Sequence, residues 1–285
     1  MRKLVIFIFY SFFLIILGRN LLFIPQITIG GDAKMKDTEA IRNDVIELLK
    51  NQKGEFNVCY YDLLTDETFG IHPDTVLTGA SLNKLPIVGY LYHLASKKEI
   101  DLQETIVIQA ADMQDYGTGS LRYEKPGQAY TLQYLAQLSL QKSDNTAAHV
   151  LEIRIGEANV QEYARQIGMS ATSMVDNEIS CRDVQTFFKS LYTNKIASPS
   201  LTSEVMGYLE NTDFEDRIPR FLPKELNVYH KTGDGVDFIH DGGIISNGKT
   251  PFILVVTSSN LSDEEKAKVM IGTIAKTIFD DRGKK

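Results

Sequence analysis

Residues 78–91 read TGASLNKLPIVGYL, and this segment places a serine and a lysine, Ser81 and Lys84, at the start of a helical pattern. Residues three apart on a helix lie on one face, so the hydroxyl and the amine are predicted to be neighbours. Leu85 and Val88 follow in the same helix, where they can exclude water from the amine. Because loss of water disfavours the ammonium form, the pattern predicts a lysine of lowered pKa that can act as a base towards the serine.

The S-x-x-K pattern is weak evidence alone, since it occurs three times in the chain, beginning at residues 81, 139 and 246. Only the first is followed by S-D-N at residues 143–145, between two helical patterns, and then by K-T-G at residues 231–233, at the end of a predicted strand. Taken singly, each motif is explained more simply by helix capping or by a solvated lysine. The three motifs in this order favour a catalytic site.

This ordered set resembles the penicillin-recognising serine hydrolase family, most closely its class A β-lactamase branch. The likeness runs from about residue 37 to the C-terminus and includes SDNTAAHVL at residues 143–151 and HKTGDG at residues 230–235. It implies a two-lobed β-lactamase/transpeptidase-like α+β fold, in which a sheet mixed from N- and C-terminal strands is flanked by helices and lies beside a helical lobe. It also implies that an amide is hydrolysed through an acyl-enzyme on Ser81.

The resemblance also implies a role for each motif residue. Ser81 is the expected nucleophile and Lys84 its base, while Ser143 is expected to pass a proton to the leaving nitrogen, with Lys231 and Asn145 holding the network. The backbone N–H groups of Ser81 and Asp234 are the expected oxyanion hole. Substrate contacts are expected from a strand edge, an amide and an aromatic wall at the pocket mouth: Thr232, Gly233, Asp234, Asn145 and Tyr116.

The chain departs from class A β-lactamases in the loop that carries their deacylating glutamate, in an E-x-x-x-N setting. The corresponding stretch is shortened, and its only glutamate, Glu178, is followed four residues later by Arg182. We therefore interpret Glu178 as a surface residue and expect slow deacylation. The arginine that often holds the substrate carboxylate is also missing from residues 234–260, where His240 is the nearest cationic candidate.

Hydrophobic patterning predicts the order of elements independently of the motifs. A helical pattern begins at Asp37, the middle of the chain is mostly helical from about residue 80 to 220, and Thr131 is the predicted cap of one of its helices. A last helix is predicted from a capping box at Ser262 and Glu265. Strands are predicted at residues 55–64, 67–73, 225–233, 236–246 and 250–259. This order predicts one sheet built from both chain ends, with a helical lobe beside it.

Residues 243–250 match G-x-x-x-x-G-K-T, the phosphate-binding P-loop pattern. A P-loop joins a strand to a helix, whereas here Pro251 and an apolar β-branched run follow the match. Asn247 and Gly248 between two strands are typical of a type I′ hairpin turn. We therefore predict a hairpin and no nucleotide site.

The first 25 residues differ from the rest of the chain. Arg2 and Lys3 precede an uncharged apolar run from Leu4 to Leu17, which is typical of a signal peptide or an N-terminal membrane anchor. Residues 26–36 are the expected linker and residues 37–285 the hydrolase domain. The domain is therefore expected outside the cytoplasm, either anchored or secreted, with membrane contact only through its N-terminal segment.

Composition excludes several classes of partner. The formal net charge is -7 and no dense block of lysine and arginine occurs, so neither nucleic acid nor an anionic-lipid surface is expected as a partner of the domain. The five histidines show no metal-ligand spacing, and no metal or cofactor is expected. A monomer is expected. The sequence leaves open whether its two cysteines, Cys59 and Cys181, form a disulfide.

Three functions are compatible with these motifs. The first is a β-lactamase-like hydrolase acting on small-molecule β-lactams. The second is a D-Ala-D-Ala carboxypeptidase or transpeptidase acting on peptidoglycan peptides, which the shortened loop favours. The third is a non-catalytic module that binds wall peptides, and the retained nucleophile and base count against it. The family that the sequence resembles most closely favours the first.

Overall fold

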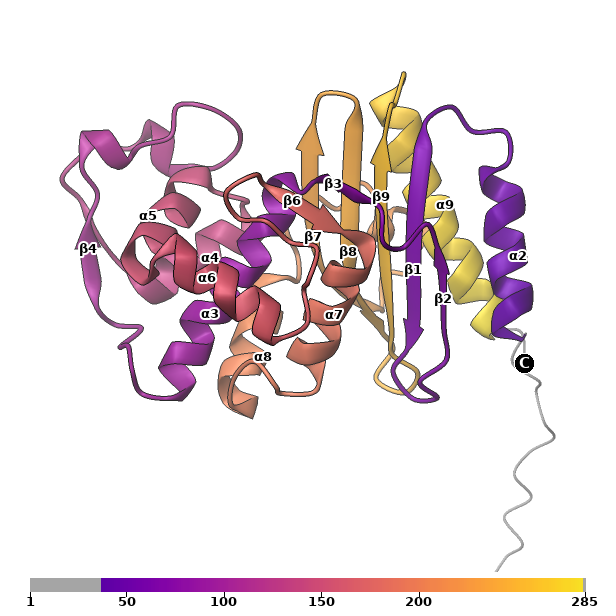
Figure 1. Ribbon diagram of the computed structural model, residues 1–285, viewed down its shortest axis with the longest axis horizontal. Helices are drawn as coiled ribbons and strands as arrows, with labels where there is room; N and C mark the ends of the chain where they lie inside the picture. Colours follow the sequence, from indigo (N-terminus) through magenta and orange to yellow (C-terminus); the bar gives the residue numbers. More distant parts are fainter. Residues whose placement is uncertain (1–36, 284–285) are drawn as a thin grey trace, which may run out of the picture.

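Strands from both ends of the chain form one five-stranded sheet in the computed structural model, which describes residues 37–283 (Figure 1). The order is β2-β1-β9-β8-β7, and every neighbouring pair is antiparallel. Glu55 lies opposite Ser259, so β1 and β9 join the two ends of the chain. The predicted sheet is confirmed, with strands β1 (Glu55–Asp62), β2 (Thr68–Ile71), β7 (Asn227–Gly235), β8 (Phe238–Ser246) and β9 (Phe252–Ser259).

Two helices cover one face of this sheet, on the right in Figure 1: α2 (Thr38–Leu49) and α9 (Glu264–Gly283). The last predicted helix is confirmed as α9, and its apolar face, which carries Ile271, Ile274 and Ile278, is fully buried against the sheet. The predicted cap of α9 is wrong by one residue. Asp263 accepts a hydrogen bond from Lys266 N at 3.1 Å, because the helix begins at Glu264 and not one residue earlier.

Most of the segment between β2 and β7 forms the predicted helical lobe, on the left in Figure 1, while one of its helices also packs on strands β1, β8 and β9 of the sheet. Thr131 caps one of its helices, as predicted, by accepting a hydrogen bond from Tyr134 N at 3.1 Å. Its α-helices are α3 (Lys84–Ser96), α4 (Leu132–Gln141), α5 (Asn145–Ile155), α6 (Glu157–Gln166), α7 (Cys181–Tyr192) and α8 (Pro199–Tyr208). The structure adds short elements that patterning did not predict: η1 (Ala80–Asn83), η2 (Ala110–Asp112), η3 (Leu121–Tyr123), η4 (Ile218–Phe221), and the strand pairs β3 (Val76–Thr78) with β6 (Glu178–Ser180) and β4 (Thr105–Val107) with β5 (Ala129–Thr131).

The P-loop-like segment is the predicted hairpin between β8 and β9. The last paired residues are Ile245 and Phe252, so six residues form the connection, and the predicted two-residue turn is wrong. The cause is the side chain of Asn247, whose Oδ1 accepts hydrogen bonds from Lys249 N and Thr250 N and widens the turn. The segment therefore joins two strands and lacks the strand-to-helix geometry of a P-loop.

The two cysteines lie side by side where α7 packs on β1. Cys59 and Cys181 are both buried free thiols, and Cys181 Sγ donates a hydrogen bond at 3.4 Å to the backbone oxygen of Val255, the residue opposite Cys59 in the sheet. Burial, followed by the neighbouring Cys59 thiol, raises the pKa of the Cys181 thiol well above its usual value. The structure therefore places the two cysteines in contact as thiols.

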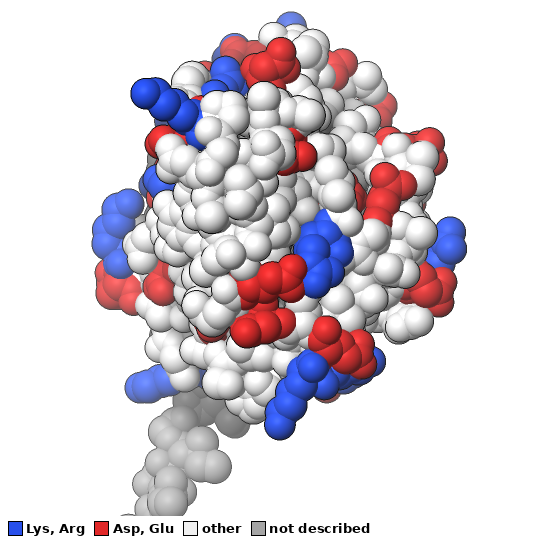
Figure 2. Space-filling model, turned by 90° about the vertical axis from the view of Figure 1, so that its left-hand side faces the viewer, with Lys and Arg blue, Asp and Glu red and all other residues white. Residues whose placement is uncertain are grey.

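The predicted export segment and linker, residues 1–36, lie outside the described residues. Within residues 37–283, no helix combines the length and apolarity that crossing a membrane requires. Figure 2 shows the end of the molecule formed by the helical lobe, where acidic and basic side chains are interspersed with uncharged surface. No basic block gathers on the part of the chain that this face displays, in agreement with the composition.

Candidate active site

A cavity of about 590 Å³ lies where the helical lobe meets the edge strand β7. It brings together residues from three regions of the sequence that the motifs had singled out. Seven of the nine predicted site residues line it: Ser81, Lys84, Tyr116, Ser143, Asn145, Thr232 and Asp234. The other two, Lys231 and Gly233, are the buried neighbours of Thr232 in β7.

Ser81 lies on the 3₁₀ turn η1 and not, as predicted, on the same α-helix as Lys84, which is the first residue of α3. Strand β7 packs against this turn. A Cβ atom on Gly233 would lie 2.9 Å from Gly79 O, so only glycine allows so close an approach. The glycine of the K-T-G motif therefore sets the distance between the serine turn and the strand edge.

The hydroxyl of Ser143 lies between two buried lysines. Lys84 Nζ donates to Ser143 Oγ at 3.2 Å, to Asn145 Oδ1 at 2.7 Å and to the backbone oxygen of Ser143. Lys231 Nζ donates to the same Ser143 Oγ at 3.0 Å and to Thr232 O at 2.9 Å. One serine oxygen thus links the amines of the first and third motifs, and a proton has a short path between them.

Burial makes both amines weaker bases than ordinary lysines. Lys84 is 7% exposed and Lys231 is 1% exposed. Burial, followed by the charge of Lys231, lowers the pKa of Lys84 well below its usual value. Burial likewise lowers the pKa of Lys231 to about 7, against the opposing charge of Asp234. Burial therefore favours the neutral form of both amines, which is the direction that the sequence predicted for Lys84.

Replacing Lys231 by methionine should change how stability depends on pH. Its pKa is about 7 in the folded chain and about 10.4 unfolded, so between these values the unfolded state binds more protons and stability rises with pH. Lys231→Met lacks this contribution. Between pH 10 and pH 7, we expect the free energy of unfolding of the variant to rise by at least about 1 kcal/mol relative to that of the wild type.

Urea unfolding of both proteins at the two pH values measures this difference. Comparison with the wild type is necessary because His230 titrates in the opposite sense: burial lowers its pKa, but Asp241 and Glu215 raise it to about 9. A stability difference that stays constant between pH 7 and pH 10 would show that Lys231 keeps an ordinary pKa.

Asp144, the middle residue of S-D-N, holds the second motif in place. It is 1% exposed, and its Oδ1 accepts from Ala147 N at 2.9 Å, so Asp144, not Asn145, caps α5. Its Oδ2 accepts from the backbone N–H groups of Ser120 at 2.6 Å and Leu121 at 2.9 Å. Sequence reasoning missed this role, although an aspartate before a helical pattern is a recognisable cap signal.

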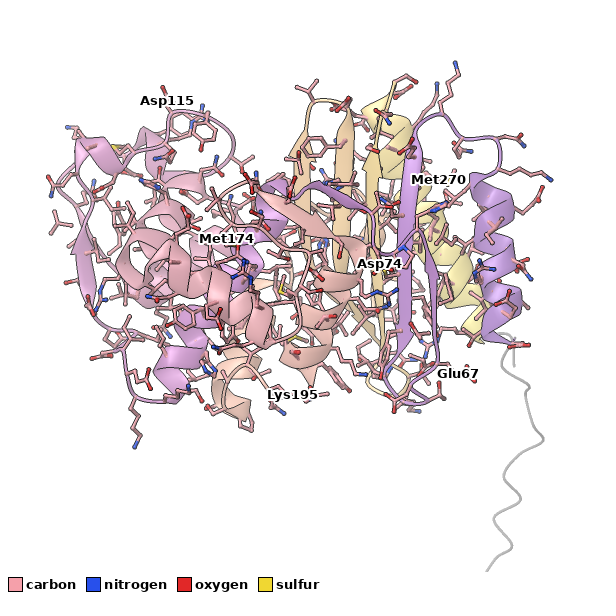
Figure 3. The ribbon with its side chains drawn as sticks, in the orientation of Figure 1. Glu67, Asp74, Asp115, Met174, Lys195 and Met270 are labelled. Atoms are coloured by element: carbon pink, nitrogen blue, oxygen red, sulfur yellow. The ribbon has the colours of Figure 1, made fainter. Side chains whose placement is uncertain are left out.

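The 114–121 loop, whose Asp115 is labelled at the top of the helical lobe in Figure 3, is fixed to the same motif. Asn145 Nδ2 donates to Tyr116 O at 3.1 Å, and Thr118 Oγ1 donates to Ser143 O at 2.7 Å. Gly117 adopts a φ of +71°, and a Cβ atom there would lie 2.3 Å from Asn145 Nδ2. The predicted aromatic wall, Tyr116, is thereby placed at the exposed rim of the cavity.

His240 is not a candidate for binding a substrate carboxylate, and this expectation is wrong. Its ring is fully buried, with Nε2–H donating to Thr78 O at 2.9 Å and Nδ1 accepting from Ser258 N at 3.2 Å. Both ring nitrogens are thus occupied in the neutral form, and burial lowers the pKa of the imidazole. His240 therefore joins β8 to β3 and β9 and does not face a substrate.

Arg217, which sequence reasoning missed, pairs with Asp234, the residue that follows the K-T-G motif. Its guanidinium binds Asp234 through two bonds, Nη1 to Oδ1 at 2.6 Å and Nη2 to Oδ2 at 2.7 Å, and also donates to His240 O. Arg217 is 1% exposed, whereas the Asp234 side chain is 43% exposed at the cavity. The buried Arg217 guanidinium therefore neutralises the Asp234 carboxylate from the side that faces away from the solvent.

Glu178 lies in β6, where it is opposite Thr78 of β3, and its side chain is exposed outside the cavity. Its neighbours Asn177 and Met174 do line the cavity. Figure 3 shows Met174 in the helical lobe, close to the boundary with the sheet. The interpretation of Glu178 as a surface residue agrees with this placement.

A glutamate that the sequence did not single out, Glu152 on α5, lines the same cavity. Burial, followed by the charge of Glu157, raises the pKa of this carboxyl to about 7. Phe214 and Phe238 add apolar walls on the β7 side. Within residues 37–283, no group of three histidine, cysteine, aspartate or glutamate side chains is arranged to hold a metal ion.

Solved structures of the same fold are similar over nearly their whole length. PBP-A superposes with a TM-score of 0.80 at 21% identity, covering 86% of this chain and 96% of PBP-A. A β-lactamase from Sphaerobacter thermophilus gives a TM-score of 0.79 at 24% identity, covering 87% of this chain and 97% of the β-lactamase. A PBP-A variant solved as an acyl-enzyme complex with penicillin G gives a TM-score of 0.81 at 20% identity, covering 87% of this chain and 98% of the variant. The fold is that of the penicillin-recognising serine hydrolases.

Sequence comparison identifies the family within this class. The chain belongs to the β-lactamase enzyme family, whose model matches residues 39–281. The β-lactamase BRO-1 of Moraxella catarrhalis is 23% identical over 164 residues, which cover 52% of each chain. This chain thus spans about half the length of that curated relative.

Proposed function

We propose that this protein opens the amide of β-lactams through an acyl-enzyme on Ser81. The observation that carries the proposal is the position of Ser143 Oγ, 3.2 Å from Lys84 Nζ and 3.0 Å from Lys231 Nζ, in the cavity that Ser81 lines. Membership of the β-lactamase enzyme family supports a β-lactam as substrate. So does the penicillin G complex of the PBP-A variant, which has the same fold.

In the proposed acylation, neutral Lys84 takes the proton of Ser81 as its Oγ attacks the carbonyl carbon. The C–N bond then breaks, and the leaving nitrogen receives a proton from the Ser143 hydroxyl, which regains one from Lys84. Lys231 holds Ser143 in place from the other side. The backbone N–H groups of Ser81 and Asp234 are the proposed donors to the oxyanion.

Intact-mass spectrometry of the full chain mixed with benzylpenicillin tests this proposal. We expect the wild type to gain the mass of one intact penicillin, because ring opening retains every atom, and Ser81→Ala to gain none. Ser246→Ala is the matched control, since Ser246 begins another S-x-x-K pattern but lies outside the cavity. An adduct that forms equally on Ser81→Ala would refute the assigned nucleophile.

A D-Ala-D-Ala peptidase is the second candidate, and the exposed position of Glu178 outside the cavity favours it. Such an enzyme uses the same acyl-enzyme without a loop glutamate. Release of D-alanine from a peptide ending in D-Ala-D-Ala, together with a penicillin adduct that persists, would select this activity over β-lactam hydrolysis.

We also propose that the domain acts outside the cytoplasm. The basic residues and apolar run within residues 1–25 support export, either as a cleaved signal or as a retained anchor. Cell fractionation and the N-terminal sequence of the mature chain distinguish these two forms.

A further inference from the structure

One face of α5 forms a wall of the cavity that leads away from the reactive groups. Asn145, Ala148 and Glu152 are spaced by three and four residues, so they share a helix face, and all three line the cavity. Asn145 Oδ1 accepts a hydrogen bond from Lys84 Nζ at 2.7 Å. Glu152 lies about two helical turns, or about 10 Å, further along the helix axis. The cavity therefore extends well beyond the groups that act on the scissile bond, and its far part contains a carboxylate.

The carboxylate of Glu152 has no partner in the protein. Within residues 37–283, its oxygens take part in no hydrogen bond and no ion pair, although the side chain is partly buried. The charge that adds to the effect of burial on its pKa is that of Glu157, another carboxylate, and within the described chain no cation opposes it. Burying an unpaired charge is costly, so a cationic ligand beside Glu152 would offset that cost.

The other ionised groups that line the cavity are already engaged. Arg217 binds the carboxylate of Asp234 through two bonds. Lys84 Nζ donates three hydrogen bonds, all of them to the S-D-N motif. His149 is one turn before Glu152 on α5, but no ion pair joins the two in the part of the chain that the structure describes. Glu152 is thus left free to bind a group that enters the cavity with a substrate.

We propose that Glu152 is a subsite for a positively charged amino group on the acyl part of the substrate. The inference rests on the proposed function and deepens it, since the subsite selects among substrates that acylate Ser81. The acyl part is assigned because the leaving nitrogen meets Ser143, which bonds to Lys231 of β7 and precedes α5. A group that extends along α5, away from this pair, belongs to the part of the substrate that stays on the serine.

The distance to Glu152 sets the length of the acyl group. A reach of about 10 Å corresponds to about three residues of extended chain. The phenylacetyl side chain of benzylpenicillin is shorter and carries no cation, so benzylpenicillin is expected to leave the subsite empty. An aminohexanoyl side chain attached to the same ring has the required length and ends in an ammonium group.

Two penicillins that differ only in the end group of this chain test the inference on the full-length protein. One carries an aminohexanoyl side chain, and the other carries a heptanoyl side chain, in which a methyl group replaces the ammonium. Intact-mass spectrometry gives the rate of adduct formation as a function of probe concentration. Because hydrogen bonds to charged groups are stronger than neutral ones, we expect the amine probe to acylate the wild type about tenfold faster at low concentration. The advantage should vanish at saturation, since the tail is bound equally before and during acylation.

Three variants make the result specific. Glu152→Gln removes the charge and keeps the size of the side chain, and the two probes should react with it at the same rate. Glu152→Lys reverses the charge and should favour a third penicillin, whose chain ends in a carboxylate, over the amine probe. Glu157→Gln is the matched control, because Glu157 is an exposed carboxylate near Glu152 that does not line the cavity. It should keep the preference of the wild type.

The outcomes separate the two proposals. If the amine and methyl probes acylate Ser81 of the wild type at equal rates at low concentration, the subsite is overturned and the proposed function stands. A preference for the amine that persists in Glu152→Gln also overturns the role of Glu152, because another group must then hold the cation. If no probe forms an adduct that depends on Ser81, the proposed function fails and the subsite fails with it.

Discussion

Lys84→Ala should slow acylation of Ser81 by benzylpenicillin about 1,000-fold, within the range of general-base effects. The variant removes the buried amine that hydrogen-bonds Ser143 Oγ and Asn145 Oδ1, and thus both the proton acceptor and the link between the first two motifs. Stopped-flow or intact-mass measurement of adduct formation gives the rate directly. The effect should fall on acylation, because the substrate contacts of β7 remain in place.

Lys142→Ala is the matched control for this prediction. Lys142 also ends an S-x-x-K pattern, but its side chain is 42% exposed and pairs with Asp213 on the surface. It should acylate at the wild-type rate. If Lys84→Ala, with an unchanged circular dichroism spectrum and melting temperature, acylates within tenfold of the wild type, another group is the base.

Asp144→Asn should lower the free energy of unfolding by about 3 kcal/mol. The carboxylate accepts from three backbone N–H groups, and an amide offers one oxygen and one NH₂ group in their place. Either orientation of the amide leaves at least one buried N–H facing another donor, which costs about 1–3 kcal/mol for each lost partner. Urea unfolding with an unchanged m-value measures the effect.

An exposed cap provides the comparison. Asp37 caps α2 at the surface by accepting from Glu39 N at 3.3 Å, so Asp37→Asn should cost less than about 0.5 kcal/mol. Equal losses in the two variants would mean that the contacts of Asp144 with the 114–121 loop add nothing to ordinary capping. We expect instead that Asp144→Asn also lowers the rate of acylation, since the 114–121 loop holds the side chain of Asn145 in place.

The fold could be predicted from the sequence because its long elements carry unambiguous patterns. The strands near both chain ends and the isoleucines of α9 have periods that leave little choice of structure. Short elements such as β3 and β6 escaped prediction, since three residues contain no period. The turn between β8 and β9 was mispredicted because the side chain of Asn247, and not the backbone alone, determines its length.

The candidate site was predictable only where motifs carry the chemistry. Ser81, Lys84 and Ser143 were found through such motifs, and the structure brings them to one cavity. Arg217 and Glu152 were missed, because nothing beside them in the sequence indicates the partner or the space that they face. Their significance depends on η4 lying behind β7 and on α5 lying along α3, which are properties of packing.

The pairing of β1 with β9 has a consequence for how the chain is made. Glu55 and Ser259 are neighbours in the sheet but 204 residues apart in the sequence. A ribosome that has completed the helical lobe has made only β1 and β2 of the five strands, so β1 exposes a bare edge while synthesis continues. Contacts of such long range close slowly. The nascent chain therefore depends on protection from aggregation until its last strand emerges, and loss of β9 by a late stop codon would leave β1 and β8 with no strand between them.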